Sequence, residues 1–115
     1  MSLPFVWFDN VGSARSETTA FLSRVFDWTA NDIGPMTFLA SGDAAPFAAT
    51  CDAMAGVSGW VPYLEVDELS GAVKVAVANG ATIVAENLEG PAGVATVIKD
   101  PGGAPLALWK RAAGV

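Results

Sequence analysis

The sequence contains no histidine among its 115 residues. Because histidine is the usual general base of serine and cysteine hydrolases and the commonest ligand of zinc, iron and nickel, its absence excludes Ser-His-Asp and Cys-His catalysis and removes the main donor for those metals. Cys51 is the only cysteine, so no intramolecular disulfide can form, which suits a reducing compartment. We therefore expect a cytoplasmic protein with no cofactor and no bound metal.

Charged residues are also scarce, at 16% of the chain, and the net charge is −6. The six Lys and Arg residues are scattered, whereas a phosphate-binding face needs clustered cations, so nucleic acid is a poor candidate partner. No apolar run approaches the roughly 20 residues that a membrane helix needs. Residues 1–4 show no signal-peptide pattern, and no membrane association is expected.

What the sequence does contain is a large apolar fraction, 52%, which is ample for a core. Two segments repeat apolar residues with a helical period, each residue of the second lying 51 positions after its counterpart. We expect Asp67 to cap the start of the second helix and Gly80, after Asn79, to end it. The two stripes are Thr18, Phe21, Leu22, Val25 and Phe26, and Leu69, Ala72, Val73, Ala76 and Val77.

Short strands are predicted around each helix, bounded by Gly, Pro, Asp and Asn turn signals. One strand precedes each helix, at residues 5–9 and 60–66. Three follow the first helix, at 28–32, 36–40 and 47–51, and three follow the second, at 82–86, 94–99 and 106–109. The order strand, helix, strand, strand, strand thus occurs twice, and Ala45-Pro46-Phe47-Ala48 is echoed by Ala104-Pro105-Leu106-Ala107. We expect one domain over residues 1–115, with modules of about 4–51 and 60–111 joined by a linker of about 52–59.

Several motifs match a known family in order and spacing: Phe26-Asp27-Trp28, Tyr63-Leu64-Glu65-Val66-Asp67, and the closing Asp100-Pro101-Gly102-Gly103-Ala104. On these the chain resembles the vicinal oxygen chelate superfamily of glyoxalase I, bleomycin-resistance proteins and extradiol dioxygenases. The resemblance implies an α+β fold of two tandem βαβββ modules forming a curved, partly open mixed β-sheet barrel with helices outside. It also implies a cavity for a small-molecule ligand and a homodimer, swapped or unswapped.

Metal-dependent members of that family place ligands on the first and last strands of each module. By position these ligands fall at Trp7 or Phe8, at Val61 or Trp60, and at the paired alanines Ala48 and Ala107. None of these side chains supplies the oxygen or nitrogen donor that a hard or borderline cation needs. The sequence therefore disfavours metal-dependent glyoxalase or dioxygenase activity.

In place of metal ligands the chain offers aromatic surface. Burial tendencies favour the core for Phe21, Phe26 and Phe47, whereas four tryptophans in so small a chain are compatible with a wet cavity because the indole N–H seeks a partner. The predicted ligand-binding residues are Trp7, Phe8, Trp28, Phe38, Thr50, Trp60 and Trp109. If the alanines at the ligand positions face the cavity, alternation places Trp109 there too.

Asp9 and Glu65 are carboxylates inside apolar strands, where desolvation could tune an acid or a base, and Tyr63 could orient a carbonyl group. The alternative for each acid is a strand end that faces solvent or caps a backbone N–H, and for Tyr63 a half-buried strand position. Cys51 is interpreted as an inert buried or edge thiol, since nothing in the sequence lowers its pKa.

The sequence leaves three functions open. The leading hypothesis is metal-independent binding of a flat, apolar or aromatic small molecule, oriented by Asp9, Tyr63 and Glu65. The second is an acid/base enzyme of the isomerase, lyase or hydrolase type that uses the same three residues. The third is a scaffold whose cavity is filled by its own side chains.

Overall fold

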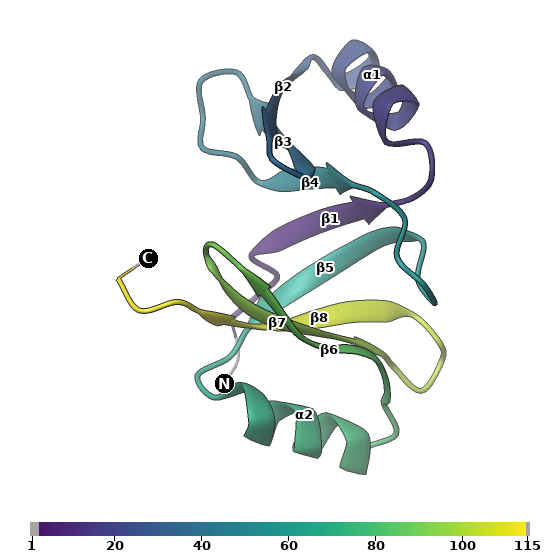
Figure 1. The fold of residues 1–115 in the computed structure, drawn as a ribbon, viewed down its shortest axis with the longest axis vertical. Coiled ribbons are helices and arrows are strands. Elements are labelled where there is room, and N and C mark those ends of the chain that lie inside the picture. The colour runs from purple at the N-terminus through teal and green to yellow at the C-terminus, as the bar shows by residue number, and fades with distance from the viewer. Residues whose placement is uncertain (1–2, 115) are drawn as a thin grey trace. The chain divides into compact units, whose positions relative to one another are not determined.

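The structure, a computed structural model, describes residues 3–114. The two ends of the predicted domain, residues 1–2 and 115, lie outside the described residues, and so does the first half of the segment 1–4 in which no signal-peptide pattern was expected. The described residues form β1 (Trp7–Val11), α1 (Arg15–Phe26), β2 (Trp28–Ile33), β3 (Met36–Ser41), β4 (Ala48–Cys51), β5 (Gly59–Glu65), α2 (Leu69–Ala78), β6 (Thr82–Gly90), β7 (Gly93–Lys99) and β8 (Pro105–Arg111) (Figure 1). The order βαβββ occurs twice, which confirms the predicted α+β class and internal duplication.

Contacts divide the chain into two compact units, which we call the first unit (residues 7–61) and the second unit (residues 3–6 and 62–114). In the first unit the strand order is β2-β3-β4-β1, with β1 and β4 parallel and the other pairs antiparallel. Helix α1 covers one face of this sheet, where Leu22 packs with the fully buried Leu39 and Ala48. Trp28 and Phe47 pack against the same cluster, so the prediction that Phe47 belongs to the core is confirmed.

The second unit repeats this plan with the strand order β5-β8-β7-β6, in which β5 and β8 are parallel. Val97, Ile98, Ala107 and Leu108 form its buried centre. Strand β6 is irregular, because its register against β7 shifts on both sides of Ala85. β6 also ends at Gly90, beyond the predicted end at residue 86.

The residues that flank each helix in the sequence determine where it begins and ends. Helix α2 is capped by Glu68 rather than by the predicted Asp67: the Glu68 backbone is extended, and its carboxylate accepts a hydrogen bond from the Gly71 N–H. The predicted end at Asn79 and Gly80 is confirmed, with Gly80 at φ 103°. Helix α1 ends at Asp27, whose φ of 58° is left-handed, the conformation for which glycine is best suited.

Two predicted core residues lie at the surface, and that prediction is wrong. The side chains of Phe21 and Phe26 are 57% and 51% exposed. The sheet-facing side of α1 buries Leu22 but otherwise presents polar residues, Arg15 and Thr19, which bond to the sheet. A helical period identified the amphipathic helix, but it did not identify which stripe the sheet would cover.

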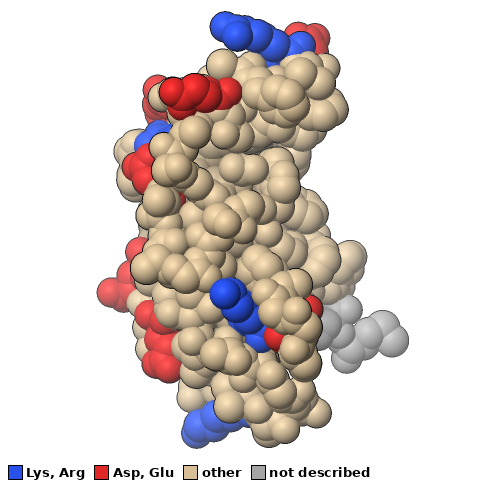
Figure 2. All heavy atoms as spheres, turned by 90° about the vertical axis from the view of Figure 1, so that its right-hand side faces the viewer, with Lys and Arg blue, Asp and Glu red and all other residues tan. Residues whose placement is uncertain are grey.

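Three smaller observations complete the description of the fold. Strand β1 begins at Trp7, two residues later than predicted. Over residues 3–114 no helix combines the length and the apolar character that crossing a bilayer requires. On the face shown in Figure 2, acidic and basic side chains lie scattered over a mostly uncharged surface, and no basic patch forms.

Candidate functional site

The face of the first unit's sheet that points away from α1 carries an aromatic pair and a carboxylate. Strand alternation puts Trp7 and Asp9 on this face, and the pairings of Asp9 with Ala49 and of Phe38 with Ala49 put Phe38 beside them. The Trp7 Nε1–H donates a 2.7 Å hydrogen bond to Asp9 Oδ1, and the rings of Trp7 and Phe38 meet edge to face at 5.3 Å. Asp9 is only 7% exposed. A buried acid beside two rings is therefore built into this face.

The thiol of Cys51 belongs to the same face, next to Asp9. Burial, followed by the charge of Asp9 and a hydrogen bond to it, raises the pKa of Cys51 to about 12. A thiol with that pKa stays protonated at neutral pH, and it is then a poor nucleophile and a poor metal ligand. This agrees with the expectation of an inert thiol.

The opposite face, toward α1, holds three of the predicted ligand-binding residues. Thr50 is fully buried, with its hydroxyl 2.7 Å from that of Thr19 on α1. Trp28 stacks on Phe26 at 5.0 Å and meets Phe47 edge to face at 4.8 Å. Phe8 alternates with Trp7 and pairs in register with Ala48, on the α1 side. Among the two candidates for the first-strand position, Trp7 therefore shares the face of Asp9 and Phe8 does not.

The register of β1 against β4 also corrects one metal-ligand position that the family resemblance implies, the one placed at Ala48 on the last strand of the first module. Ala48 lies under α1 with Leu22 and Leu39, so it does not face the side that carries Trp7 and Asp9. Ala49 does, because it pairs with Asp9. Only the last residue of the Ala-Pro-Phe-Ala echo, Ala48, lies in β4, and a shift of one residue exchanges the two faces of a strand.

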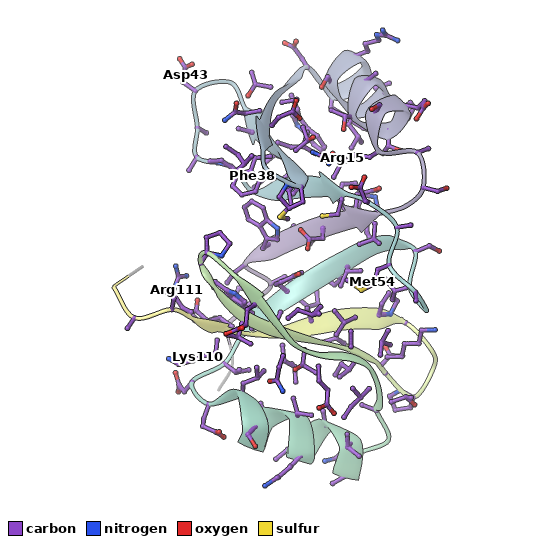
Figure 3. The ribbon with its side chains drawn as sticks, in the orientation of Figure 1. Arg15, Phe38, Asp43, Met54, Lys110 and Arg111 are labelled. Atoms are coloured by element: carbon purple, nitrogen blue, oxygen red, sulfur yellow. The ribbon has the colours of Figure 1, made fainter. Side chains whose placement is uncertain are left out.

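Arg15 was not singled out from the sequence, yet it organises the polar layer beneath α1 (Figure 3). Its guanidinium donates to Thr37 Oγ1 from Nε and Nη2, at 3.1 and 3.0 Å, and lies within 3.8 Å of Asp32 and 3.5 Å of Asp52. Thr37 in turn donates to Asp32. These three partners lie 17 to 37 residues after Arg15, so sequence spacing gave no signal for the network.

In the second unit, Tyr63 and Glu65 share one face of β5 and pair in register with Ala107 and Trp109 of β8. The Arg111 guanidinium donates two hydrogen bonds to Glu65, of 3.0 and 2.9 Å, and lies 4.8 Å from the centre of the Trp109 ring. These bonds to Arg111 hold the pKa of Glu65 below its usual value. Glu65 is thus kept ionised, and Arg111 is a residue of this site that sequence reasoning missed. Trp60, on the part of β5 that belongs to the first unit, is 42% exposed.

These donors do not fit the metal that the family resemblance implies. The face that carries Asp9 offers one carboxylate and one protonated thiol, and Ala49 stands opposite the acid. Within residues 3–114 no three His, Cys, Asp or Glu side chains come together as a metal-binding group. A divalent cation needs at least three such ligands held together.

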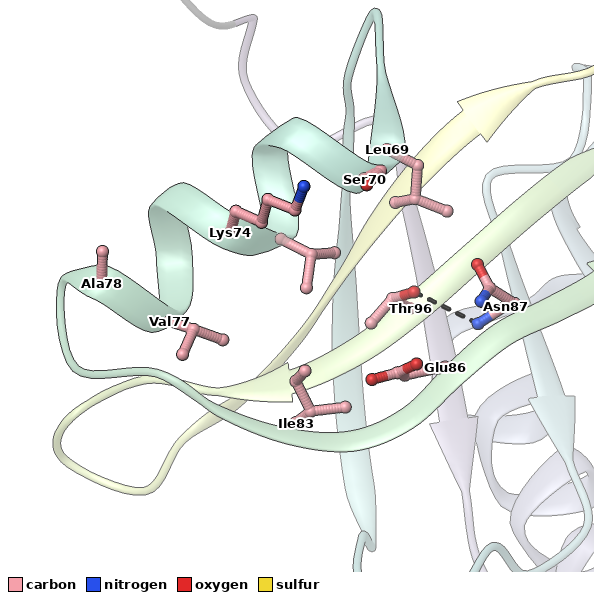
Figure 4. A pocket seen from close by; sticks show the side chains of 10 residues that line it. Leu69, Ser70, Lys74, Val77, Ala78, Ile83, Glu86, Asn87 and Thr96 are labelled. Atoms are coloured by element: carbon pink, nitrogen blue, oxygen red, sulfur yellow. Dashed lines mark hydrogen bonds between the residues drawn. The ribbon is translucent and has the colours of Figure 1, made fainter.

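A separate groove lies between α2 and strands β6 and β7 (Figure 4). Its volume is about 530 Å³, and Val73, Val77 and Ile83 form much of its apolar wall. Glu86 and Asn87 reach it from the irregular part of β6, where Asn87 has a φ of 52° and donates its N–H to Thr96 Oγ1. None of the residues predicted to bind ligand lines this groove. The buried acid and its aromatic neighbours therefore lie at a different place from this groove.

No family model matches the sequence, and no curated protein matches it. Solved structures do match. A glyoxalase/bleomycin resistance protein/dioxygenase superfamily member from Vibrio splendidus 12B01 is 12% identical with a TM-score of 0.63, over 90% of this chain and 96% of that one. Methylmalonyl-CoA epimerase from Mycobacterium tuberculosis is 14% identical with a TM-score of 0.62, over 97% and 93%. The Mn(II)-bound glyoxalase from Novosphingobium aromaticivorans is 16% identical with a TM-score of 0.64, over 95% and 39%.

The duplicated βαβββ order and these likenesses together show that the chain has the fold of the glyoxalase, bleomycin-resistance and dioxygenase superfamily, the vicinal oxygen chelate fold. At sequence identities of 12 to 16%, these structural likenesses show the fold alone, and the activity has to be argued from the site.

Proposed function

We propose that the protein binds a flat, largely apolar small molecule without a metal ion, on the sheet face of Trp7, Asp9 and Phe38. The observation that carries the proposal is the buried Asp9 carboxylate, held by the Trp7 indole at 2.7 Å beside an aromatic pair. Ligand sites are typically apolar walls with a few fixed polar anchors, and this face has that composition.

The two rings favour a planar ligand. Trp7 and Phe38 are half-buried, so each presents part of its ring for stacking. Their edge-to-face contact fixes both orientations before any ligand arrives, which lowers the entropy lost on binding.

The carboxylate favours a ligand with a hydrogen-bond donor, above all a cationic amine. Trp7 orients one oxygen of Asp9, and the acidic balance of the chain attracts cations at long range. A charge-assisted hydrogen bond in a poorly solvated site is stronger than one in water. Four further residues remain predicted ligand contacts: Trp60, Tyr63, Glu65 and Trp109. The homodimer and the cytoplasmic location also remain predictions.

Thermal-shift and calorimetric titrations with three probes test the proposal: 4-aminoquinoline is flat and cationic, naphthalene-2-carboxylate is flat and anionic, and cyclohexylamine is cationic but not flat. We expect the melting temperature to rise with 4-aminoquinoline concentration and to respond less to the other two. Asp9→Asn should weaken 4-aminoquinoline binding at least about tenfold, since a hydrogen bond to a charged group contributes about 1.5–3 kcal/mol.

Asp43→Asn is the matched control, because it removes the same charge from an exposed turn of the same unit. It should leave binding unchanged. Phe38→Leu tests the ring independently if Asp9→Asn unfolds the protein, and it should weaken the flat probes more than cyclohexylamine. Equal affinity in the Asp9 and Asp43 variants, or no stabilisation by any probe, would contradict the proposal and favour a scaffold.

A second function, acid/base catalysis, is favoured by the burial of Asp9 and its contact with the Cys51 thiol, because catalytic acids and bases are commonly desolvated. Glu65 suits this role less, since Arg111 holds it ionised. Turnover of a carbonyl substrate with a bell-shaped pH profile, lost in Asp9→Asn and kept in Glu65→Gln, would establish it. Unchanged turnover in a variant that carries both Asp9→Asn and Glu65→Gln would contradict acid/base catalysis by these residues.

A further inference from the structure

The groove of the second unit has one wall from α2 and one wall from the sheet, and each wall carries a charged side chain (Figure 4). Lys74 lines the groove from the helix, and Glu86 lines it from β6. Both side chains are exposed, and among the described residues neither takes part in an ion pair. The groove therefore presents two opposite charges that the chain itself does not neutralise.

The wall from the helix follows the period of α2. Four of its positions have i, i+3, i+4, i+7 spacing and consequently share the face that lines the groove. They are Ser70, Val73, Lys74 and Val77. Two valines one turn apart thus form an apolar strip beside the ammonium group.

The wall from the sheet carries its acid because β6 is irregular. The register of β6 against β7 shifts between Ile83 and Ala85 and again between Ala85 and Leu88. In a regular strand the neighbours Glu86 and Asn87 point to opposite faces, whereas here both line the groove. Bulges re-aim side chains in this way and are common beside binding sites.

The apolar wall and the two charges together select the kind of molecule that fits. A volume of about 530 Å³ lies within the range of small-molecule sites, and Val73, Val77 and Ile83 offer hydrocarbon contact. A simple anion is attracted by Lys74 and repelled by Glu86, and a simple cation is attracted and repelled in the opposite sense. A molecule that carries both charges on an aliphatic body is complementary to both walls.

We propose that this groove is a second binding site, which takes a zwitterionic aliphatic molecule whose carboxylate pairs with Lys74 and whose ammonium group pairs with Glu86. The carboxylate lies toward the first turn of α2, where Ser70 has a hydroxyl to donate and the helix dipole favours negative charge. The hydrocarbon between the two charges covers the apolar wall.

This site is separate from the proposed site for a flat ligand. The groove is built from residues of the second unit, whereas Trp7, Asp9 and Phe38 belong to the first unit. The two proposals therefore succeed or fail independently, and a ligand of either site is recognised by the unit whose signals it perturbs.

Amide NMR titrations of the full chain test the proposal with three probes of equal carbon number: 6-aminohexanoate carries both charges, hexanoate carries the negative one, and hexylamine carries the positive one. We expect 6-aminohexanoate to bind about fivefold or more tightly than either of the others, since it alone forms both ion pairs. Its binding should shift amide signals of α2 and β6. Shifts confined to the first unit, or an affinity no greater than that of hexanoate and hexylamine, would overturn the proposal.

Charge exchange tests the two contacts separately. Lys74→Glu and Glu86→Lys each leave two like charges on the groove and should weaken 6-aminohexanoate binding about fivefold or more. The variant with both changes should recover most of the wild-type affinity, because the ligand can then bind in the reverse direction.

Lys110→Glu and Glu89→Lys are matched controls, because they reverse exposed charges of the same unit that do not line the groove. They should leave the affinity unchanged, and all the variants should keep the near-ultraviolet circular dichroism of the wild type. Single variants at the groove that bind as well as these controls would overturn the proposal. A loss that the exchange of both charges does not restore would overturn it equally.

Discussion

The two units share one strand order but use their helices differently. In the first unit, α1 seals its sheet with Leu22, Leu39 and Ala48, while the opposite face holds the buried Asp9. In the second unit, none of the residues of α2 is fully buried, and a groove of about 530 Å³ remains between the helix and the sheet. At equivalent helix positions the first unit has Leu22 and the second has Val73. Duplication fixed the topology, and side-chain volume decided where space was left.

The two units also differ in the surroundings of their candidate acids, Asp9 and Glu65. Asp9 is 7% exposed and lies beside a tryptophan and a thiol. Glu65 meets a guanidinium at the surface, where solvent screens the pair. Buried polar groups are therefore concentrated in the first unit, which is why its sheet face is the stronger candidate site.

The largest expected effect concerns the Cys51 thiol. With a pKa of about 12 in place of 9.0, the thiolate fraction at pH 8 falls about a thousandfold, so alkylation by iodoacetamide should be slower by that factor in native protein than in guanidinium. Asp9→Asn should accelerate the native reaction, because it removes a charge that raises this pKa. Native and unfolded rates within tenfold of each other would remove the contrast between the units.

The next largest difference between the two units should appear in the free energy of unfolding when a helix side chain that faces the sheet is shortened to alanine. Leu22→Ala should lower the free energy of unfolding by about 3 kcal/mol, since the side chain is buried in a closed cluster. Val73→Ala, at the equivalent helix position but beside the groove, should cost about 1 kcal/mol or less, because less surface is buried. Urea unfolding of both variants measures the difference, and equal losses would show that α2 is as tightly packed as α1.

The Glu65 pair should stabilise the second unit only above acid pH. Its pKa is lowered in the folded state, so its contribution is present above the ordinary value of 4.5 and is lost as the pH falls through the folded value. The stability difference between wild type and Glu65→Gln should therefore shrink in acid titrations of thermal unfolding. Glu86→Gln, which removes a carboxylate of the same unit outside this ion pair, is the control. A difference between wild type and Glu65→Gln that is as large in strong acid as at neutral pH would refute the ion-pair explanation.

The smallest effects concern backbone strain. Asp27 at φ 58° should accept glycine with a gain of up to about 1 kcal/mol in the free energy of unfolding, because glycine adopts this conformation without a Cβ penalty. Asn87→Gly, at φ 52° in the second unit, should gain less, since asparagine tolerates the left-handed region better. Differential scanning calorimetry can rank them, and a loss in Asp27→Gly would argue against strain at this helix end.

Much of the fold was predictable because it depends on local patterns. The helical stripes, the Gly and Pro punctuation and the Asp100-Pro101-Gly102-Gly103 turn located both helices and eight strands to within a few residues. The site was predictable only in part. Trp7, Asp9 and Phe38 were named from the sequence and lie together, whereas Arg15 and Arg111 were missed because their partners are more than 15 and 45 residues away.

Periodicity and turn residues by themselves determined the number, order and type of the elements and the duplication, because those depend on neighbours a few positions apart. The register of β1 against β4 was decided only in three dimensions, and with it which of Trp7 and Phe8 shares a face with Asp9. So were the exposure of Phe21 and Phe26 and the groove under α2. Each of these depends on whether distant side chains fill the space between a helix and a sheet, which no local pattern encodes.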